Sequence, residues 1–269
     1  MTKYEGILFT DIDGTFKRWS MFLDFFDLLM KRNRDMVSPE DMFELSELKA
    51  AWQRRTRPFD DYVNRALELY IRLLPRLDEK SFNEIMLRVV NSKYDRVYAF
   101  TRALITRYKE KNWYICAVSA SPHIGVQRFC DLWGINEGFG TVHEVDQSGH
   151  FTGVRRTVND KVKAEIVQEV LARPEFSHIE RTNTMAIGDS EGDIPMLSLV
   201  GTAIAFNPSG ELLKFHLESD VRQARVLVLE RKDVVYEIYD RGQRMVVSQM
   251  HPTTPRRVLM SSGMKGLLG

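Results

Sequence analysis

The chain has 269 residues, a formal net charge of +1 and 43% hydrophobic residues. This length is sufficient for one large α/β domain, or for an ordinary core with a smaller second unit. The near-neutral charge argues against recruitment to nucleic acid or to an acidic membrane, and no apolar stretch approaches the length of a membrane span. Residues 1–6 lack a signal-peptide pattern, and Cys116 and Cys130 lack the paired spacing of a zinc site. A cytoplasmic protein is therefore expected.

The N-terminal half is predicted to contain one strand followed by helices. An apolar run at 7–10 predicts a buried strand, which the sequence Asp-Ile-Asp-Gly-Thr at 11–15 ends. From about residue 16 to 111 the apolar residues recur at helical spacing, and no convincing strand pattern occurs. Helices are expected over 19–31, from Pro39 after the Ser38 N-cap, and over 59–74, 81–94 and 97–108.

Strand patterns return in the second half and alternate with helices. A strand is expected at 114–118, and a hairpin over 142–154 with its turn at 146–149. A helix is expected over 159–171, and further strands at 184–187, 203–206, 225–229 and 234–239. This alternation predicts a mainly parallel sheet that helices cover on both faces.

The order of these elements predicts a Rossmann-like α/β core with a helical cap inserted after the first strand. Residues 1–15 and 98–250 are assigned to the core, and residues 16–97 to the cap. The basic segment 251–269 contains glycine and serine, and we expect it to form a flexible tail.

Asp11 and Asp13 follow the first predicted strand, where an open parallel sheet binds its ligands. Two close carboxylates repel each other unless a cation or a proton lies between them. Mg²⁺ would keep Asp11 ionised as a nucleophile, and Asp13 would serve as general acid and base. Taken alone, the motif is explained equally well as an Asp-rich turn at a strand end.

Three further polar segments follow later strands or open the helices after them. Ser119 and neighbouring backbone amides such as that of Ala120 are candidates for holding phosphate oxygens, although a serine helix cap is the commoner role. A lysine at a helix start, at position 161 or 163, would neutralise a phosphoryl group, although most lysines are simply exposed. Asp189 would supply another metal carboxylate, supported by Asp193 one turn away, although acidic helix starts also occur without metal.

The ordered set Asp-x-Asp-Gly-Thr, strand–Ser, Lys and Gly-Asp-x-x-x-Asp resembles the haloacid dehalogenase (HAD) superfamily over residues 7–206. The long helical insert is similar to that of the phosphoserine phosphatase-like subfamily, subfamily IB. The resemblance implies a magnesium-dependent phosphatase that uses an aspartyl-phosphate intermediate. The segment at 163–167 looks most like the family's lysine motif, which favours Lys163 over Lys161. The implied roles are nucleophile for Asp11, acid/base for Asp13, phosphate binding for Ser119 and Lys163, and metal binding for Asp11, the Asp13 carbonyl, Asp189 and Asp193.

The cap is expected to select a small phosphorylated metabolite. Phosphoserine phosphatases are expected to hold the substrate's amino group with a glutamate shortly after the first motif, but residues 17–22 contain no acid and Asp24 has a different spacing. This departure argues against phosphoserine. Other candidates for substrate contact have ordinary surface or core explanations as well; they are Arg18, Trp19, Arg54–Arg57 and His123. The sequence does not determine the oligomeric state.

Three other functions are compatible with this scaffold, because fold does not fix function. The chain would be a phosphate-binding regulatory protein if it had lost turnover, or a phosphotransferase if an alcohol replaced water as the acceptor. The third alternative is cleavage of a carbon–halogen bond, and Asp13 argues against it because that reaction does not need the acid/base.

Overall fold

The computed structural model describes residues 3–218, 223–231, 234–239, 244–250 and 255–257. Its strands are β1 (Gly6–Thr10), β2 (Trp113–Pro122), β3 (Glu137–Val145), β4 (Phe151–Arg156), β5 (Thr184–Gly188), β6 (Thr202–Phe206), β7 (Ala224–Arg231), β8 (Val234–Tyr239), β9 (Arg244–Met250) and β10 (Pro255–Arg257). Its helices are α1 (Met21–Arg32), α2 (Pro39–Gln53), α3 (Phe59–Leu73), α4 (Glu79–Lys93), α5 (Ala99–Glu110), α6 (His123–Trp133), α7 (Asp160–Leu171), α8 (Ile194–Ser198) and α9 (Gly210–Glu218).

The described strands form one sheet in the order β10-β9-β8-β7-β6-β5-β1-β2-β3-β4. The strands from β7 to β3 run parallel, and antiparallel strands extend the sheet at both edges. β1 lies between β5 and β2, so that Thr10 is opposite both Ile187 and Ala117. The segments that follow these three strands therefore emerge side by side, and the predicted mainly parallel α/β fold is confirmed.

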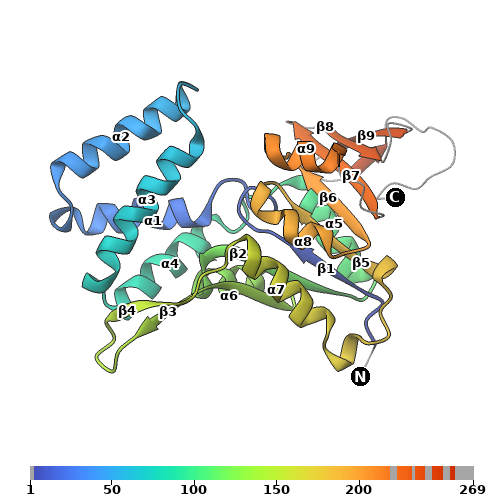
Figure 1. The fold of residues 1–269 in the computed structure, drawn as a ribbon, viewed down its shortest axis with the longest axis horizontal. Helices are drawn as coiled ribbons and strands as arrows, with labels where there is room; N and C mark the ends of the chain where they lie inside the picture. The colour runs from blue at the N-terminus through green and yellow to red at the C-terminus, as the bar shows by residue number, and fades with distance from the viewer. Residues whose placement is uncertain (1–2, 219–222, 232–233, 240–243, 251–254, 258–269) are drawn as a thin grey trace.

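Helices pack on both faces of the sheet (Figure 1). Successive side chains of a strand point to opposite faces, so Leu8 belongs to one apolar cluster while Ile7 and Phe9 belong to another. The Leu8 cluster contains buried residues of α1, α3, α4, α5 and α6, and the Phe9 cluster contains those of α7, α8 and α9.

The helical insert, α1 to α4, follows β1 and lies beside one end of the sheet (Figure 1). Its buried apolar side chains form one continuous cluster with those on the adjoining face of the sheet. The β3–β4 hairpin also fastens the insert: the Glu79 amide donates to the Gly149 carbonyl at 2.8 Å, and Tyr70 Oη lies 2.6 Å from His143 Nε2. Contacts at both places hold the insert against the core. The division into core and cap at residues 15/16 and 97/98 stays a prediction.

The structure differs from the sequence-based expectations at several places. β2 continues through Ser119 to Pro122, and its pairing with β3 shifts register between Val118 and Pro122. α9 and β9 were not predicted. β10 lies within the predicted flexible tail, and the remainder of 251–269 lies outside the described residues. No helix in the described part of the chain is both long and apolar enough to span a membrane.

Candidate active site

Asp11 follows β1 and is only 4% exposed. Its amide donates to the Ile187 carbonyl at 3.0 Å, which extends the pairing of β1 with β5 past the end of the strand. Lys163 Nζ, from the first turn of α7, lies 2.7 Å from Asp11 Oδ1, while Oδ2 is buried without a hydrogen-bond partner. Burial raises the pKa of Asp11 well above its ordinary value, and the Lys163 ammonium opposes that rise.

Lys163 also holds Asp193, which lies one turn beyond the end of β5. Its ammonium is 2.6 Å from Asp193 Oδ1, and its pKa is raised because Asp11 and Asp193 together outweigh the burial of the lysine. Asp193 Oδ2 accepts hydrogen bonds from the amides of Asp189 and Ser190 and from the Ser190 hydroxyl, at 3.1, 3.0 and 3.1 Å. Asp193 Oδ2 therefore fixes the loop that carries Asp189, while Oδ1 pairs with Lys163.

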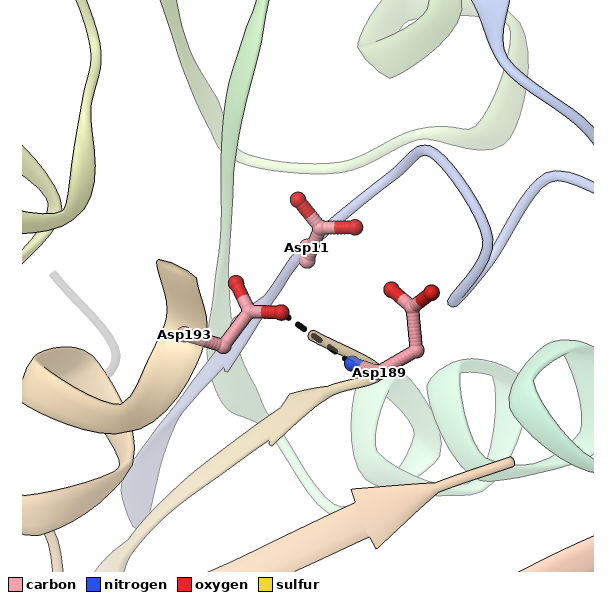
Figure 2. A group of neighbouring side chains, drawn as sticks. All are labelled: Asp11, Asp189 and Asp193. Carbon is pink, nitrogen blue, oxygen red and sulfur yellow. Dashed lines mark hydrogen bonds between the residues drawn. The ribbon is translucent and has the colours of Figure 1, made fainter. Parts of the chain in front are cut away.

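One oxygen from each of Asp11, Asp189 and Asp193 lies within 4.8 Å of the other two. Figure 2 shows these carboxylates gathered at the ends of β1 and β5. Burial, followed by the charge of Asp193, raises the pKa of Asp189 to about 7. Three close carboxylates, one of them with an unpartnered buried oxygen, are a donor set that suits a hard divalent cation. The residues present therefore fit Mg²⁺, and of the three Asp193 already accepts hydrogen bonds from Lys163 and from the loop that carries Asp189.

Gly14 is required for this arrangement of the acidic residues. Its φ is +88°, and a Cβ atom at this position would lie 2.2 Å from Asp189 Oδ2. The next residue, Thr15, donates its hydroxyl to Asp189 Oδ1 at 2.7 Å. The segment after β1 thus approaches Asp189 closely and also orients its carboxylate.

Asp13 has different partners from Asp11. Its Oδ2 accepts hydrogen bonds from the hydroxyls of Ser119 and Ser121, at 2.9 and 2.7 Å, and its Oδ1 accepts from the Met21 amide. The irregular end of β2 makes this possible, since three residues there stand opposite the single residue Gly140 of β3. The serine motif therefore contacts the second carboxylate directly, a relationship that the sequence did not reveal.

A cleft of about 1040 Å³ opens beside these groups, and its lining includes Asp13, Gly14 and Asp189. Asp11 is not part of the lining but is buried next to Asp189. The insert also contributes to the lining, through Trp52 and other apolar residues.

The structure places the remaining candidate residues as follows. Arg18 does not line the cleft; it pairs with Glu230 at 2.9 Å and lies over the Tyr98 ring. The side chain of Ala120 is exposed, and its carbonyl accepts from Thr141. Lys161 has an 82% exposed side chain, 3.8 Å from Glu165. Trp19 lines the cleft, whereas Arg54–Arg57 are exposed and, like His123, do not line it.

Asp24, the only acid considered for a substrate amino group, is already paired within the protein. Its two carboxylate oxygens contact Lys17 Nζ at 2.7 Å and Lys93 Nζ at 2.6 Å. Lys17 is only 1% exposed, so this ion pair is buried. This pairing could not be predicted from the sequence, because the partners come from different segments of the insert.

The family model for haloacid dehalogenase-like hydrolases matches residues 8–198. A putative hydrolase of Mycobacterium leprae (strain TN) is 29% identical over 218 residues, which are 76% of this chain and 67% of that protein. Phosphoserine phosphatase SerB1 of Mycobacterium tuberculosis (strain ATCC 25618 / H37Rv) is 30% identical over 57% of this chain and 47% of SerB1. The chain therefore spans about two thirds of the first relative and about half of the second.

Solved structures show the same fold. A protein of unknown function from Bordetella pertussis Tohama I has a TM-score of 0.59 and 19% identity, covering 80% of this chain and 95% of that one. A phospho-aspartyl intermediate analogue of phosphoserine phosphatase has a TM-score of 0.51 and 18% identity, covering 79% and 91%. The family match spans most of the chain, and the fold agrees with it. The chain belongs to the haloacid dehalogenase-like hydrolase family.

Proposed function

We propose that this hydrolase is a magnesium-dependent phosphatase that cleaves a phosphate monoester through an aspartyl-phosphate on Asp11. The observation that carries the proposal is the Asp11 carboxylate: one oxygen is held by Lys163 and the other is buried without a partner, beside Asp189. The contact of Oδ1 with Lys163 orients the Asp11 carboxylate, and Oδ2 is left without a hydrogen-bond donor that would compete with attack on phosphorus. The phosphoserine phosphatase activity named for SerB1 agrees with this reaction class.

In the proposed first step, an Asp11 oxygen bonds to phosphorus as the bond to the ester oxygen breaks. Asp13 gives a proton to the departing alkoxide, and in the second step it takes a proton from the water that releases phosphate. Its placement in the cleft lining, anchored by Ser119 and Ser121, supports this role. Lys163 would stabilise the negative charge of the phosphoryl oxygens.

Asp11 and Asp189 would hold Mg²⁺, together with the Asp13 carbonyl that the family resemblance implies, while Asp193 positions the Asp189 loop. The bound ion would supply positive charge that keeps Asp11 ionised and offsets charge on the phosphoryl group. Lys161 takes no part, since its ammonium is exposed near Glu165.

The test is release of inorganic phosphate from an aryl phosphate, measured with Mg²⁺ and with a chelator. We expect release only with Mg²⁺, and a loss of at least a thousandfold in a folded Asp11→Asn protein. Full activity of Asp11→Asn would exclude the proposed nucleophile. Binding of phosphate without turnover would favour a regulatory protein, and transfer of the phosphoryl group to an added alcohol would favour a phosphotransferase.

A further inference from the structure

Three aromatic side chains form one side of the cleft, and we call them the aromatic wall: Trp19, Trp52 and Phe59. Their ring centroids lie 4.9 to 5.5 Å from one another, and each ring remains partly exposed. Val63 of α3 extends the same apolar surface. Rings buried only for packing would be covered by protein, whereas these present surface to the cleft beside Asp13.

The backbone around Trp19 holds its ring in this wall. Trp19 has a φ of +76°, a conformation that a bulky residue adopts only when its surroundings impose it. Lys17 contributes to this constraint, because its ammonium lies 3.4 Å from the Trp19 carbonyl while it pairs with Asp24. The buried ion pair described above thus fixes the segment that joins Asp13 to the wall.

The charges around the cleft have one sign. Of the described residues that line it, none is lysine, arginine or histidine, whereas Asp60, Asp160 and Glu191 are exposed acids of the lining. The ammonium of Lys163 is engaged by Asp11 and Asp193. A substrate with a second anionic group would therefore find no lining cation to pair with and would be repelled by the acids.

Resting on the proposed function, we infer that the substrate is a phosphate monoester whose alcohol part carries an aromatic or similarly broad apolar group and no negative charge. The apolar group would stack on the aromatic wall while its phosphate lies at Asp13 and Asp189. Phosphoserine does not fit this class, because its carboxylate would lack a partner and Asp24 is not free to bind its ammonium.

The substrates for the test share a primary alkyl leaving group, so that differences in leaving-group chemistry are small. The four compounds are ethyl phosphate, 2-phenylethyl phosphate, 2-(4-carboxyphenyl)ethyl phosphate (the para-carboxylate) and phosphoserine. We expect kcat/KM for 2-phenylethyl phosphate to exceed that for ethyl phosphate by at least about tenfold, because binding transfers the phenyl ring from water to the apolar surface of the wall. The para-carboxylate and phosphoserine should be poorer than 2-phenylethyl phosphate by a similar factor. Equal rates for all four compounds, or a preference for phosphoserine, would overturn the inference.

Single-residue variants test whether the aromatic wall causes the preference for 2-phenylethyl phosphate over ethyl phosphate. Trp52→Ala should raise KM for 2-phenylethyl phosphate about tenfold more than it raises KM for ethyl phosphate, because only the phenyl compound stacks on the wall. Phe43→Ala is the control, since Phe43 lies on the same helix, is 69% exposed and does not line the cleft. Asp60→Lys should raise kcat/KM for the para-carboxylate compound relative to that for 2-phenylethyl phosphate, because it replaces an acid of the lining by a cation. An unchanged substrate preference in Trp52→Ala would exclude the wall as its cause.

A binding measurement separates this inference from the proposed function. Quenching of tryptophan fluorescence is followed while 2-phenylethyl phosphate or ethyl phosphate is added to the Asp11→Asn protein with Mg²⁺. Tighter binding of the phenyl compound, reduced in Trp52→Phe/Asp11→Asn, supports the inference even if no substrate is hydrolysed by the parent protein. Equal binding of the two compounds would overturn the inference even if both are hydrolysed.

Discussion

The ammonium of Lys163 lies 2.6 Å from the carboxylate of Asp193, and neither side chain is more than 8% exposed. The same ammonium lies 2.7 Å from Asp11. One buried cation thus connects the residue that follows β1 with the loop that follows β5. The proposed nucleophile and the Asp189 loop are positioned by the same lysine.

The first prediction concerns this lysine. Lys163→Met would leave the acidic cluster without its cation, and we expect the free energy of unfolding to fall by about 3–5 kcal/mol at pH 7 without Mg²⁺. Phosphatase activity should fall by at least about a hundredfold. Denaturant unfolding and phosphate release measure the two effects. Lys161→Met is the matched control on the same helix, and it should change neither, because that side chain is 82% exposed.

The second prediction concerns Gly14. In Gly14→Ala the new Cβ would meet Asp189 Oδ2 at 2.2 Å, so Asp189 must move and the binding of Mg²⁺ should weaken by at least about tenfold. Gly149→Ala is the control: its φ of +82° imposes similar backbone strain, but nothing lies within 4 Å of the added carbon. Titration of Mg²⁺ by calorimetry compares the two variants. Equal affinities would show that close approach to Asp189 is unimportant.

The third prediction tests the buried pairing of Asp24. Asp24→Asn leaves the ammonium of Lys17 buried without a counter-charge, and we expect the free energy of unfolding to fall by about 3 kcal/mol. Asp27→Asn on the same helix removes a partly exposed pair with Lys49 and should cost less than about 1 kcal/mol. Urea unfolding of both variants gives the comparison. Similar losses would contradict a special role for the buried pair.

The fourth prediction concerns pH and His143, which lies on β3 and packs against Tyr70 and Phe82 of the insert. Burial lowers the pKa of His143 to about 4, below its ordinary value of 6.5, so the unfolded chain binds more protons between these pH values. The stability that neutral His143 contributes to the folded protein is therefore fully present above pH 6.5, and it is lost as the pH falls through about 4.

His143→Phe keeps an aromatic ring in the same cluster but removes the titrating group. Thermal unfolding at pH 7 and at pH 5 should show a larger drop in Tm for the parent protein than for His143→Phe. The difference isolates His143, because the other titrating groups are common to both proteins. An identical drop would show that His143 does not couple stability to pH.

The amino-acid pattern alone predicts most of the strands and helices in their order, and the places where chemistry-bearing residues follow strands. Apolar periodicity is local, so the strand at 7–10 and the strand before Gly188 were visible without coordinates. The motif order likewise indicated which carboxylates would converge, since parallel strands end at a common edge.

The partners of these residues, in contrast, follow from the folded arrangement and not from the pattern along the chain. Two lysines two positions apart cannot be distinguished by their spacing to distant strands, yet Lys163 faces Asp11 while Lys161 faces solvent. In the sequence nothing near Asp24 indicates a partner, but in the folded insert it forms ion pairs with Lys17 and Lys93. Charge pairs and cleft walls are built from segments far apart in the chain, so their energies depend on distances that the sequence does not contain.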